Sequence, residues 1–462
     1  MIYFFDDQSL DARVGMRRDY EIPEFIPAST YRDPSDYAVS PGFPTVFYSE
    51  KLGEYIMIYN VMEPDDQESL DIFICAAHSK DLESWEALDT RELCDIPNRK
   101  LFNQIFPVMQ GECYCYEDKT APSEERYKLL YCRYAPNLRM ANEIYVSPDL
   151  FSWKKLEGVT WNEQGAEPGL GCFYSEKLKK HVITCRPHWA DRRVCITMTE
   201  DFRTFTPLSQ ILTTDSMDEP LSEAYGMPCF QYKDIVIGFL WKFFRPQDTS
   251  TVSVGNQLIN NSGRLEPELV YSKNGQYFQR SLRKSFIPKN DPSKPYYGCL
   301  YPSSIVETDD DIRIFASCSQ GEHYDFRKRG IGSIVSFKIK KDRFIYLEGN
   351  SAAYIRTRNL LIEGPISVNA HIFEKMRCRL IGSDGVEVAG FGYDDFDAFS
   401  GDSTDYVLTW QGKDTSSLKG KTCSLEISLM CGRLYAIKGD FKVLAFNQTR
   451  LYNTFGTLDE DI

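Results

Sequence analysis

Short apolar runs separated by polar turns follow one another along the first 350 residues of the chain. Apolar runs of this length, bounded by turn residues, predict β-strands. One block, an apolar strand marked by proline, a polar turn and a second apolar strand, is repeated. Its five copies begin at Phe43, Ile105, Pro168, Tyr225 and Leu300.

A second landmark follows each copy of this block. It is Ser or Thr, any residue, then Asp or Asn, with an aromatic residue four positions after the acid or amide. A short polar side chain at this point can hydrogen-bond its own backbone and close a hairpin. The clear copies are Ser79–Trp85, Ser147–Trp153, Thr199–Phe205 and Ser272–Phe278, and a degenerate copy is Ser336–Phe344.

Two landmarks that recur together predict four-stranded units, five times over. Such units repeated radially are the blades of a β-propeller. We therefore expect a five-bladed β-propeller over residues 1–350, with blades near 37–95, 100–160, 161–210, 218–285 and 296–350. After residue 350 the landmarks stop. Short alternating strands with turns such as Ser383–Gly385 predict an antiparallel β-sandwich over residues 351–462.

Composition and charge limit the classes of molecule that the protein is expected to bind. The 462 residues carry a formal net charge of −14, which disfavours nucleic acid and anionic membranes but is compatible with neutral sugars. The longest apolar run, Ile235–Phe244, is too short to span a bilayer, and the N-terminus lacks the pattern of a secretory signal. Most of the 14 Cys sit singly in apolar runs, as buried reduced thiols do. A cytoplasmic location is expected, and self-association stays open.

Common catalytic motifs are absent from the sequence. It contains no G-x-S-x-G elbow, dinucleotide fingerprint, P-loop or H-E-x-x-H, and no two of its five His have metal-ligand spacing. We therefore expect no metal and no cofactor. No calcium loop is readable either, although a calcium ion in the propeller channel stays an open alternative.

Carboxylate chemistry remains. The first strand of each blade begins at the mouth of the channel, so acids that precede these strands converge on one axis. Paired carboxyl groups of this kind cleave glycosidic bonds, one as general acid and one as base or nucleophile. The candidates are Asp33, Asp36, Glu167 and Glu223. Against this, an acid before a strand is commonly a turn former, and Arg32–Pro34 could simply be a surface turn.

Other polar and aromatic residues at the same strand ends are candidates for substrate binding. They could hydrogen-bond sugar hydroxyls or stack on a ring, and packing of the loops is an equally good explanation for some of them. They are Arg186, His188, Tyr225, Tyr301, His323 and Asp218.

Several segments resemble a known family. Tyr225–Phe230 with Gly238–Trp241, and Tyr301–Ser304, are similar to segments of bacterial glycoside-hydrolase-like proteins, which share the five-bladed propeller of glycoside hydrolase families 32 and 43. The resemblance covers nearly the whole chain and implies a propeller followed by a sandwich. The family 32 catalytic motifs do not carry over. Arg32–Pro34 matches R-D-P but precedes blade one, and Glu112-Cys113 matches E-C but reads as a turn within blade two.

Three functions are therefore weighed. The first is a glycoside hydrolase that acts on a short oligosaccharide. The second is a propeller that binds carbohydrate without catalysis. The third is a phosphorylase on the same fold, which would need a cationic phosphate pocket, for which Arg186, Arg192 and Arg193 are candidates.

Overall fold

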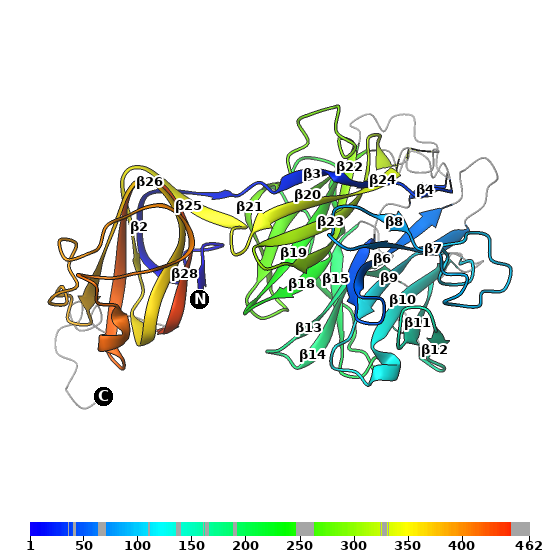
Figure 1. The fold of residues 1–462 in the computed structure, drawn as a ribbon, viewed down its shortest axis with the longest axis horizontal. Coiled ribbons are helices and arrows are strands. Elements are labelled where there is room, and N and C mark those ends of the chain that lie inside the picture. Colours follow the sequence, from blue (N-terminus) through cyan, green and yellow to red (C-terminus); the bar gives the residue numbers. More distant parts are fainter. Residues whose placement is uncertain are drawn as a thin grey trace. The chain divides into compact units, whose positions relative to one another are not determined.

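The computed structural model describes residues 1–35, 37–39, 43–62, 71–109, 111–134, 140–159, 161, 166–187, 192–245, 263–323, 325, 330 and 332–444. Within these ranges the regular elements are β-strands and short 3-10 helices, η2 (Ser123–Glu125) and η4 (Thr415–Leu418), with no α-helix (Figure 1). The all-β prediction is confirmed. No helix within the same ranges is long and apolar enough to cross a membrane.

The chain divides into two compact units. Unit 1 consists of residues 1–22 and 339–462, and unit 2 consists of residues 23–338. This division differs from the boundary expected at residue 350, because β2 (Leu10–Tyr20) pairs with β25 (Ile345–Thr357) and so draws the N-terminus into unit 1. Hydrophobic patterning predicts strands but does not specify a partner more than 300 residues away.

The first three sheets of unit 2 each consist of strands consecutive in the chain. One contains β4 (Ala38–Val39), β5 (Thr45–Ser49), β6 (Glu54–Met62), β7 (Ile72–Ser79) and β8 (Glu86–Ala87). The next contains β9 (Cys113–Glu117), β10 (Tyr127–Tyr134), β11 (Met140–Ser147) and β12 (Lys154–Lys155). The third contains β13 (Ala166–Ser175), β14 (Lys180–Pro187), β15 (Val194–Thr199) and β16 (Ser209–Leu212).

The remaining sheet of unit 2 has nine strands in two groups. The first group is β17 (Ser222–Gly226), β18 (Cys229–Tyr232), β19 (Ile235–Phe244), β20 (Arg264–Ser272) and β21 (Phe278–Ser285). The second is β22 (Cys299–Glu307), β23 (Asp311–Ser319), β24 (Gly332–Lys340) and β3 (Glu24–Tyr31). A single residue pair, Leu265 with Cys299, joins the groups. The outer strand of the last group is thus supplied by the N-terminal part of the chain.

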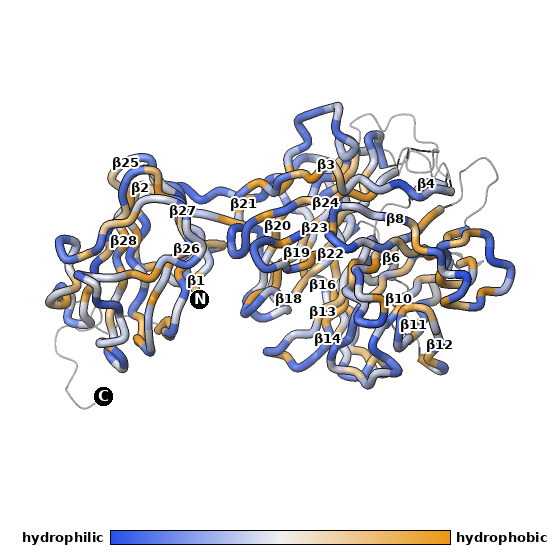
Figure 2. Tube along the Cα trace, in the orientation of Figure 1, coloured by the Kyte–Doolittle hydropathy of each residue, from blue (hydrophilic) through white to orange (hydrophobic). Residues whose placement is uncertain are grey.

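Strands of unit 2 are buried on both faces. In β6, Ile56 and Ile58 pack with apolar residues of the β9–β12 sheet, whereas Met57 and Tyr59 point the other way and pack with residues such as Phe315 of β23. Successive side chains of a strand alternate between faces, so a strand enclosed on both sides reads as a continuous apolar run. Figure 2 shows such apolar segments along the strands of this unit.

The predicted turn chemistry is present. Asp81 Oδ1 accepts hydrogen bonds from the backbone N–H groups of Glu83 and Ser84, at 2.8 and 2.7 Å, in the turn between β7 and β8. Asp149, Asp201 and Asn274 make the equivalent bonds in three other sheets. The residue after each of these side chains has a positive φ, as at Leu82 (φ 63°). The hydrogen bonds of the Asx turn stabilise a backbone conformation that non-glycine residues otherwise avoid.

Unit 1 is a six-stranded sheet. It contains β1 (Ile2–Tyr3), β2, β25, β26 (Leu360–Gly382), β27 (Phe399–Val407) and β28 (Thr422–Val443). The long strands β26 and β28 carry repeated register irregularities, which bend a sheet. Their inner side chains enclose a core that includes the fully buried Trp410, whose indole N–H donates to the carbonyl of Cys378 at 3.0 Å. These strands form one sheet, and a two-sheet sandwich remains a prediction.

Candidate functional site

The most unusual carboxyl group of unit 2 belongs to Glu112, the residue immediately before β9. Its backbone carbonyl accepts a hydrogen bond from Cys132 at 3.0 Å, which anchors the start of the strand. Burial raises the pKa of the side chain to about 7, and the nearby Arg186 guanidinium only partly opposes this shift. No hydrogen bond from a described residue accounts for the shift. A carboxyl group in this state is divided between acid and carboxylate near neutral pH.

Arg186, in β14, lies between Glu112 and an aromatic ring. Its guanidinium stacks on Tyr225 with 4.3 Å between the guanidinium carbon and the ring centroid, and one nitrogen contacts the Tyr225 carbonyl at 3.4 Å. Burial lowers the pKa of Arg186, although a guanidinium stays charged throughout the working pH range. The sequence placed Arg186 and Tyr225 on separate strands, and the fold brings them into contact.

His323 connects two tyrosines of the candidate set. Its Nε2 lies 3.0 Å from the Tyr225 hydroxyl and its Nδ1 lies 2.6 Å from the Tyr301 hydroxyl. A neutral imidazole has one donor and one acceptor nitrogen, so one tyrosine donates to the ring and the other accepts from it. Tyr301 is only 1% exposed and His323 only 3%, so both are buried members of this hydrogen-bonded chain, and their contacts with substrate stay predictions.

Glu223, in β17, has a different environment from Glu112. Its carboxylate accepts hydrogen bonds from Arg192 at 2.6 Å and from Arg245 at 3.1 and 2.8 Å. Arg192 in turn lies over the Tyr225 and Phe243 rings. Glu223 is thus held in an ion-paired cluster with two guanidinium groups.

Asp33 is buried, with 7% of its surface exposed. Its Oδ2 accepts hydrogen bonds from the Tyr59 hydroxyl at 2.6 Å and from Asn103 at 2.9 Å, and its Oδ1 accepts from the Ser35 backbone at 2.9 Å. The bond from Ser35 is that of a turn former, as one alternative for Arg32–Pro34 expected, while the bonds from Tyr59 and Asn103 hold the same carboxylate in the interior. Asp33 is held by residues from three separate segments of the chain, as a positioned carboxylate requires.

Asp218 is the site candidate that the structure places in a buried ion-pair network. Its side chain is 1% exposed and lies 2.6 Å from Arg280 and 2.9 Å from Lys242. Burial opposes ionisation, but hydrogen bonds from Arg280 and Lys242 outweigh it and hold the pKa of Asp218 well below its usual range. The side chain has almost no exposed surface, so the expected substrate contact gives way to a structural role.

The side chains of three predicted site residues lie outside the part of the chain that the structure describes. Asp36 and His188 lie outside the described residues. The backbone of Glu167 pairs with Arg186 across β13 and β14, but its side chain is likewise outside the described part of the structure. Among the residues that are described, no group of three or more His, Cys, Asp or Glu side chains has the arrangement of a metal site. The predictions for these three residues, for cofactors and for calcium stay predictions.

Glu112 is not among the catalytic candidates predicted from the sequence, although the Glu112-Cys113 dipeptide matches the E-C motif. The sequence predicts that this dipeptide lies in a turn. The structure instead begins β9 at Cys113, so Glu112 occupies the position before a first strand that defined the other candidates. Arg245 was missed because nothing in its local sequence indicates that it reaches Glu223.

Comparison with known proteins gives structural likenesses only. No family model and no curated protein matches the chain. It is similar to a solved glycoside hydrolase at 12% identity and a TM-score of 0.47, over 69% of this chain and 92% of that one. It is also similar to β-1,2-mannobiose phosphorylase from Listeria innocua, solved with β-1,2-mannobiose, at 10% identity and a TM-score of 0.45, over 70% and 96% of the two chains. An N-acetylgalactosamine deacetylase from F. plautii gives 12% identity and a TM-score of 0.47, over 70% and 96%.

Proposed function

We propose that unit 2 is a five-bladed β-propeller that cleaves the glycosidic bond of a short oligosaccharide, with Glu112 as the general acid. Five groups of strands support the propeller. So do the contacts of β5 with β9 and β22, and of β13 with β9 and β18, which run most of the way around a ring of first strands. In this fold β3 completes the last blade and so closes the ring with the N-terminal part of the chain.

The observation that carries the proposed activity is the carboxyl group of Glu112. A glycosidic oxygen leaves as a poor alkoxide unless it is protonated in the transition state. A general acid for this step must keep its proton near neutral pH, and burial raises the pKa of Glu112 to about 7. After it gives up its proton, the Glu112 carboxylate is stabilised by Arg186, the cation nearest to it among those that affect its pKa.

The other residues take supporting roles in this proposal. Tyr225 orients the substrate, with its ring backed by Arg186 and its hydroxyl positioned by His323. Asp33 is the second carboxylate, the base or nucleophile predicted from the sequence. Asp36 and Glu167 stay alternatives for this role. Glu223 holds Arg192 and Arg245 in place rather than acting as the acid, because its carboxylate is already hydrogen-bonded to both guanidinium groups.

Phosphorolysis is the second candidate function, and a cluster of three arginines favours it. Arg186 and Arg192 both lie over the Tyr225 ring, at 4.3 and 5.3 Å, and Arg245 shares Glu223 with Arg192. Three guanidinium groups so close together suit a phosphate. Arg193, the third arginine of the sequence-based hypothesis, bonds instead to Gln210 at 2.7 Å, and Arg245 takes its place.

The test is a substrate screen with wild-type protein and a Glu112→Gln variant. Disaccharides and aryl glycosides are each incubated with and without inorganic phosphate, and released sugar is measured. We expect turnover of a disaccharide by the wild type and a loss of about 10²–10⁴-fold in Glu112→Gln. A dinitrophenyl glycoside, whose leaving group needs no proton, should be cleaved at nearly the wild-type rate by both proteins. Phosphate dependence would assign phosphorolysis.

Two outcomes would contradict the proposal. The first is wild-type turnover that Glu112→Gln leaves intact, which would place the general acid elsewhere. The second is saccharide binding without turnover across the panel, which would make the protein a carbohydrate-binding propeller.

A further inference from the structure

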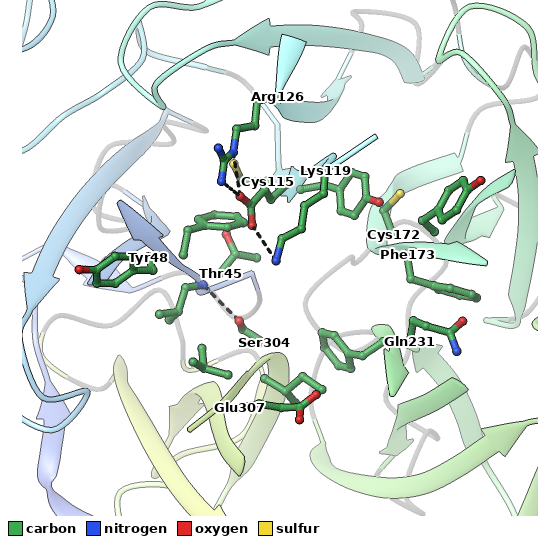
Figure 3. A pocket seen from close by; sticks show the side chains of 18 of the residues that line it. Thr45, Tyr48, Cys115, Lys119, Arg126, Cys172, Phe173, Gln231, Ser304 and Glu307 are labelled. Atoms are coloured by element: carbon green, nitrogen blue, oxygen red, sulfur yellow. Dashed lines mark hydrogen bonds and ion pairs between the residues drawn. The ribbon is translucent and has the colours of Figure 1, made fainter. Parts of the chain in front are cut away.

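A cavity lies toward the ends of the first strands away from Glu112. It has a volume of about 770 Å³ and is lined by the ends of β5, β9, β13, β18 and β22 and by the turns that follow them (Figure 3). Its lining includes Glu117 but neither Glu112 nor Arg186 nor Tyr225. At about 3.3 Å per residue, the five residues from Glu112 to Glu117 separate the two ends of β9 by roughly 16 Å. The lining extends back along β9 as far as Tyr114, two residues after Glu112, but contains none of Glu112, Arg186 and Tyr225.

One wall of the cavity is held rigid by a buried network. Tyr116 and Thr120 line the cavity, and their hydroxyls lie 3.2 and 3.3 Å from the two ring nitrogens of His181. Behind them Asp118 pairs with Lys128 at 3.3 Å, and both side chains are less than 5% exposed. A wall whose side chains are locked by second-layer hydrogen bonds is pre-organised for a ligand.

Several polar groups that line the cavity have hydrogen-bond donors or acceptors that no described residue uses. Ser304 Oγ accepts from the Val46 N–H at 3.1 Å, and no described residue takes its proton. Both amide protons of Gln231 go to backbone carbonyls, at 2.7 and 3.0 Å, so its Oε1 stays available as an acceptor. The Thr45 hydroxyl, on a residue 3% exposed, has no partner in the described part of the structure. A buried hydroxyl without a partner costs stability unless something else bonds to it.

Aromatic and charged side chains complete the lining. Phe173 and Phe230 supply apolar surface. Figure 3 shows the Lys119 side chain directed into the cavity, and its ammonium group lies 3.8 Å from the Glu117 carboxylate. Sugars present apolar C–H faces together with hydroxyls that both donate and accept, which matches this mixture. The volume is also in the range of small-molecule sites.

We propose that this cavity binds a short saccharide of one or two sugar units, at a second site separate from the Glu112 site. The proposal rests on the lining of the cavity and not on the proposed activity.

The test blocks the opening with a Lys119→Trp substitution. Lys119 lies in an exposed turn, with 78% of its side chain accessible, so the fold should tolerate an indole that covers the cavity. Lys80→Trp is the matched control, because Lys80 is 83% accessible, makes a comparable ion pair with Glu54 at 3.5 Å and does not line the cavity. Each substitution is made in wild type and in Glu112→Gln, and thermal unfolding checks the fold.

Binding of mannobiose, cellobiose and lactose to the Glu112→Gln proteins is measured by titration calorimetry. We expect at least one disaccharide to bind with Lys119 intact, Lys119→Trp to weaken that binding at least tenfold, and Lys80→Trp to leave it unchanged. In the wild-type background Lys119→Trp should retain turnover. The proposal would be overturned if the Lys119→Trp and Lys80→Trp proteins bound the disaccharide equally well. It would also be overturned if none of the proteins tested bound any of the three disaccharides. Failure of the proposed function would appear separately, as turnover that survives Glu112→Gln.

Discussion

Glu112 and Glu223 each interact with an arginine that stacks on Tyr225, Arg186 and Arg192 respectively, yet their environments are opposite. Glu223 is hydrogen-bonded by two arginines, at 2.6 and 2.8 Å, whereas Glu112 has only the electrostatic influence of Arg186 against the effect of burial. Glu223 is thus paired with two cations, whereas burial favours the protonated form of Glu112. Both residues are glutamates at the start of a strand, Glu112 immediately before β9 and Glu223 as the second residue of β17, and their neighbours separate an ion-paired carboxylate from a candidate acid.

The sharpest test of this contrast is the stability of Glu112→Gln as a function of pH. The folded protein holds the Glu112 proton up to about pH 7, and the unfolded chain releases it near pH 4.5. Wild-type stability therefore falls as pH rises through this window, and glutamine avoids the loss. We expect the variant to be more stable than wild type by about 3 kcal/mol at pH 8, with no gain at pH 4. Urea unfolding at the two pH values measures it.

A related prediction concerns the rate of glycoside cleavage. Only protonated Glu112 can act as the acid, so kcat/KM should fall tenfold per pH unit above pH 7, or about a hundredfold by pH 9. The pH profile of wild-type protein on a disaccharide checks this limb. A dinitrophenyl glycoside should lack it. If both substrates show the same decline, the titrating group is not the acid.

Glu223→Gln should have the opposite effect on stability from Glu112→Gln. It leaves Arg192 and Arg245 without their carboxylate, and we expect a loss of about 1–3 kcal/mol at pH 7, reduced from the value of a fully buried pair because Arg245 is 28% exposed. Urea unfolding of the two glutamine variants side by side gives the comparison. A Glu223→Gln protein as stable as wild type would show that these pairs contribute little.

The smallest effect is expected from Tyr301→Phe. The substitution removes the hydroxyl that bonds to His323 Nδ1 at 2.6 Å and keeps the ring. Loss of one hydrogen bond of about 1 kcal/mol should lower kcat about fivefold through a misplaced Tyr225, with KM nearly unchanged. Steady-state kinetics separates the two constants. A fall in thermal stability with both constants unchanged would make Tyr301 a packing residue only.

Local chemistry accounts for what could be predicted from the sequence. The Asx turns at Asp81, Asp149, Asp201 and Asn274 depend on side chains and backbone within three residues, and all are present. The continuous burial of β6 from Ile56 to Met62 likewise follows from its own apolar run. The sequence marks Asp33 as a candidate carboxylate, but its burial among Tyr59 and Asn103 depends on residues from other segments of the chain.

The amino-acid sequence by itself determined that the chain is a series of strands with repeated turns and that carboxyl groups precede several of them. Only the tertiary structure decided which carboxyl group keeps its proton, that β3 joins β24, and that the first 22 residues belong with the C-terminal unit. The physical reason is the distance along the chain between the groups that interact. A turn is determined by atoms a few residues apart, whereas a pKa and a strand pairing depend on groups that folding brings together from distant parts of the chain.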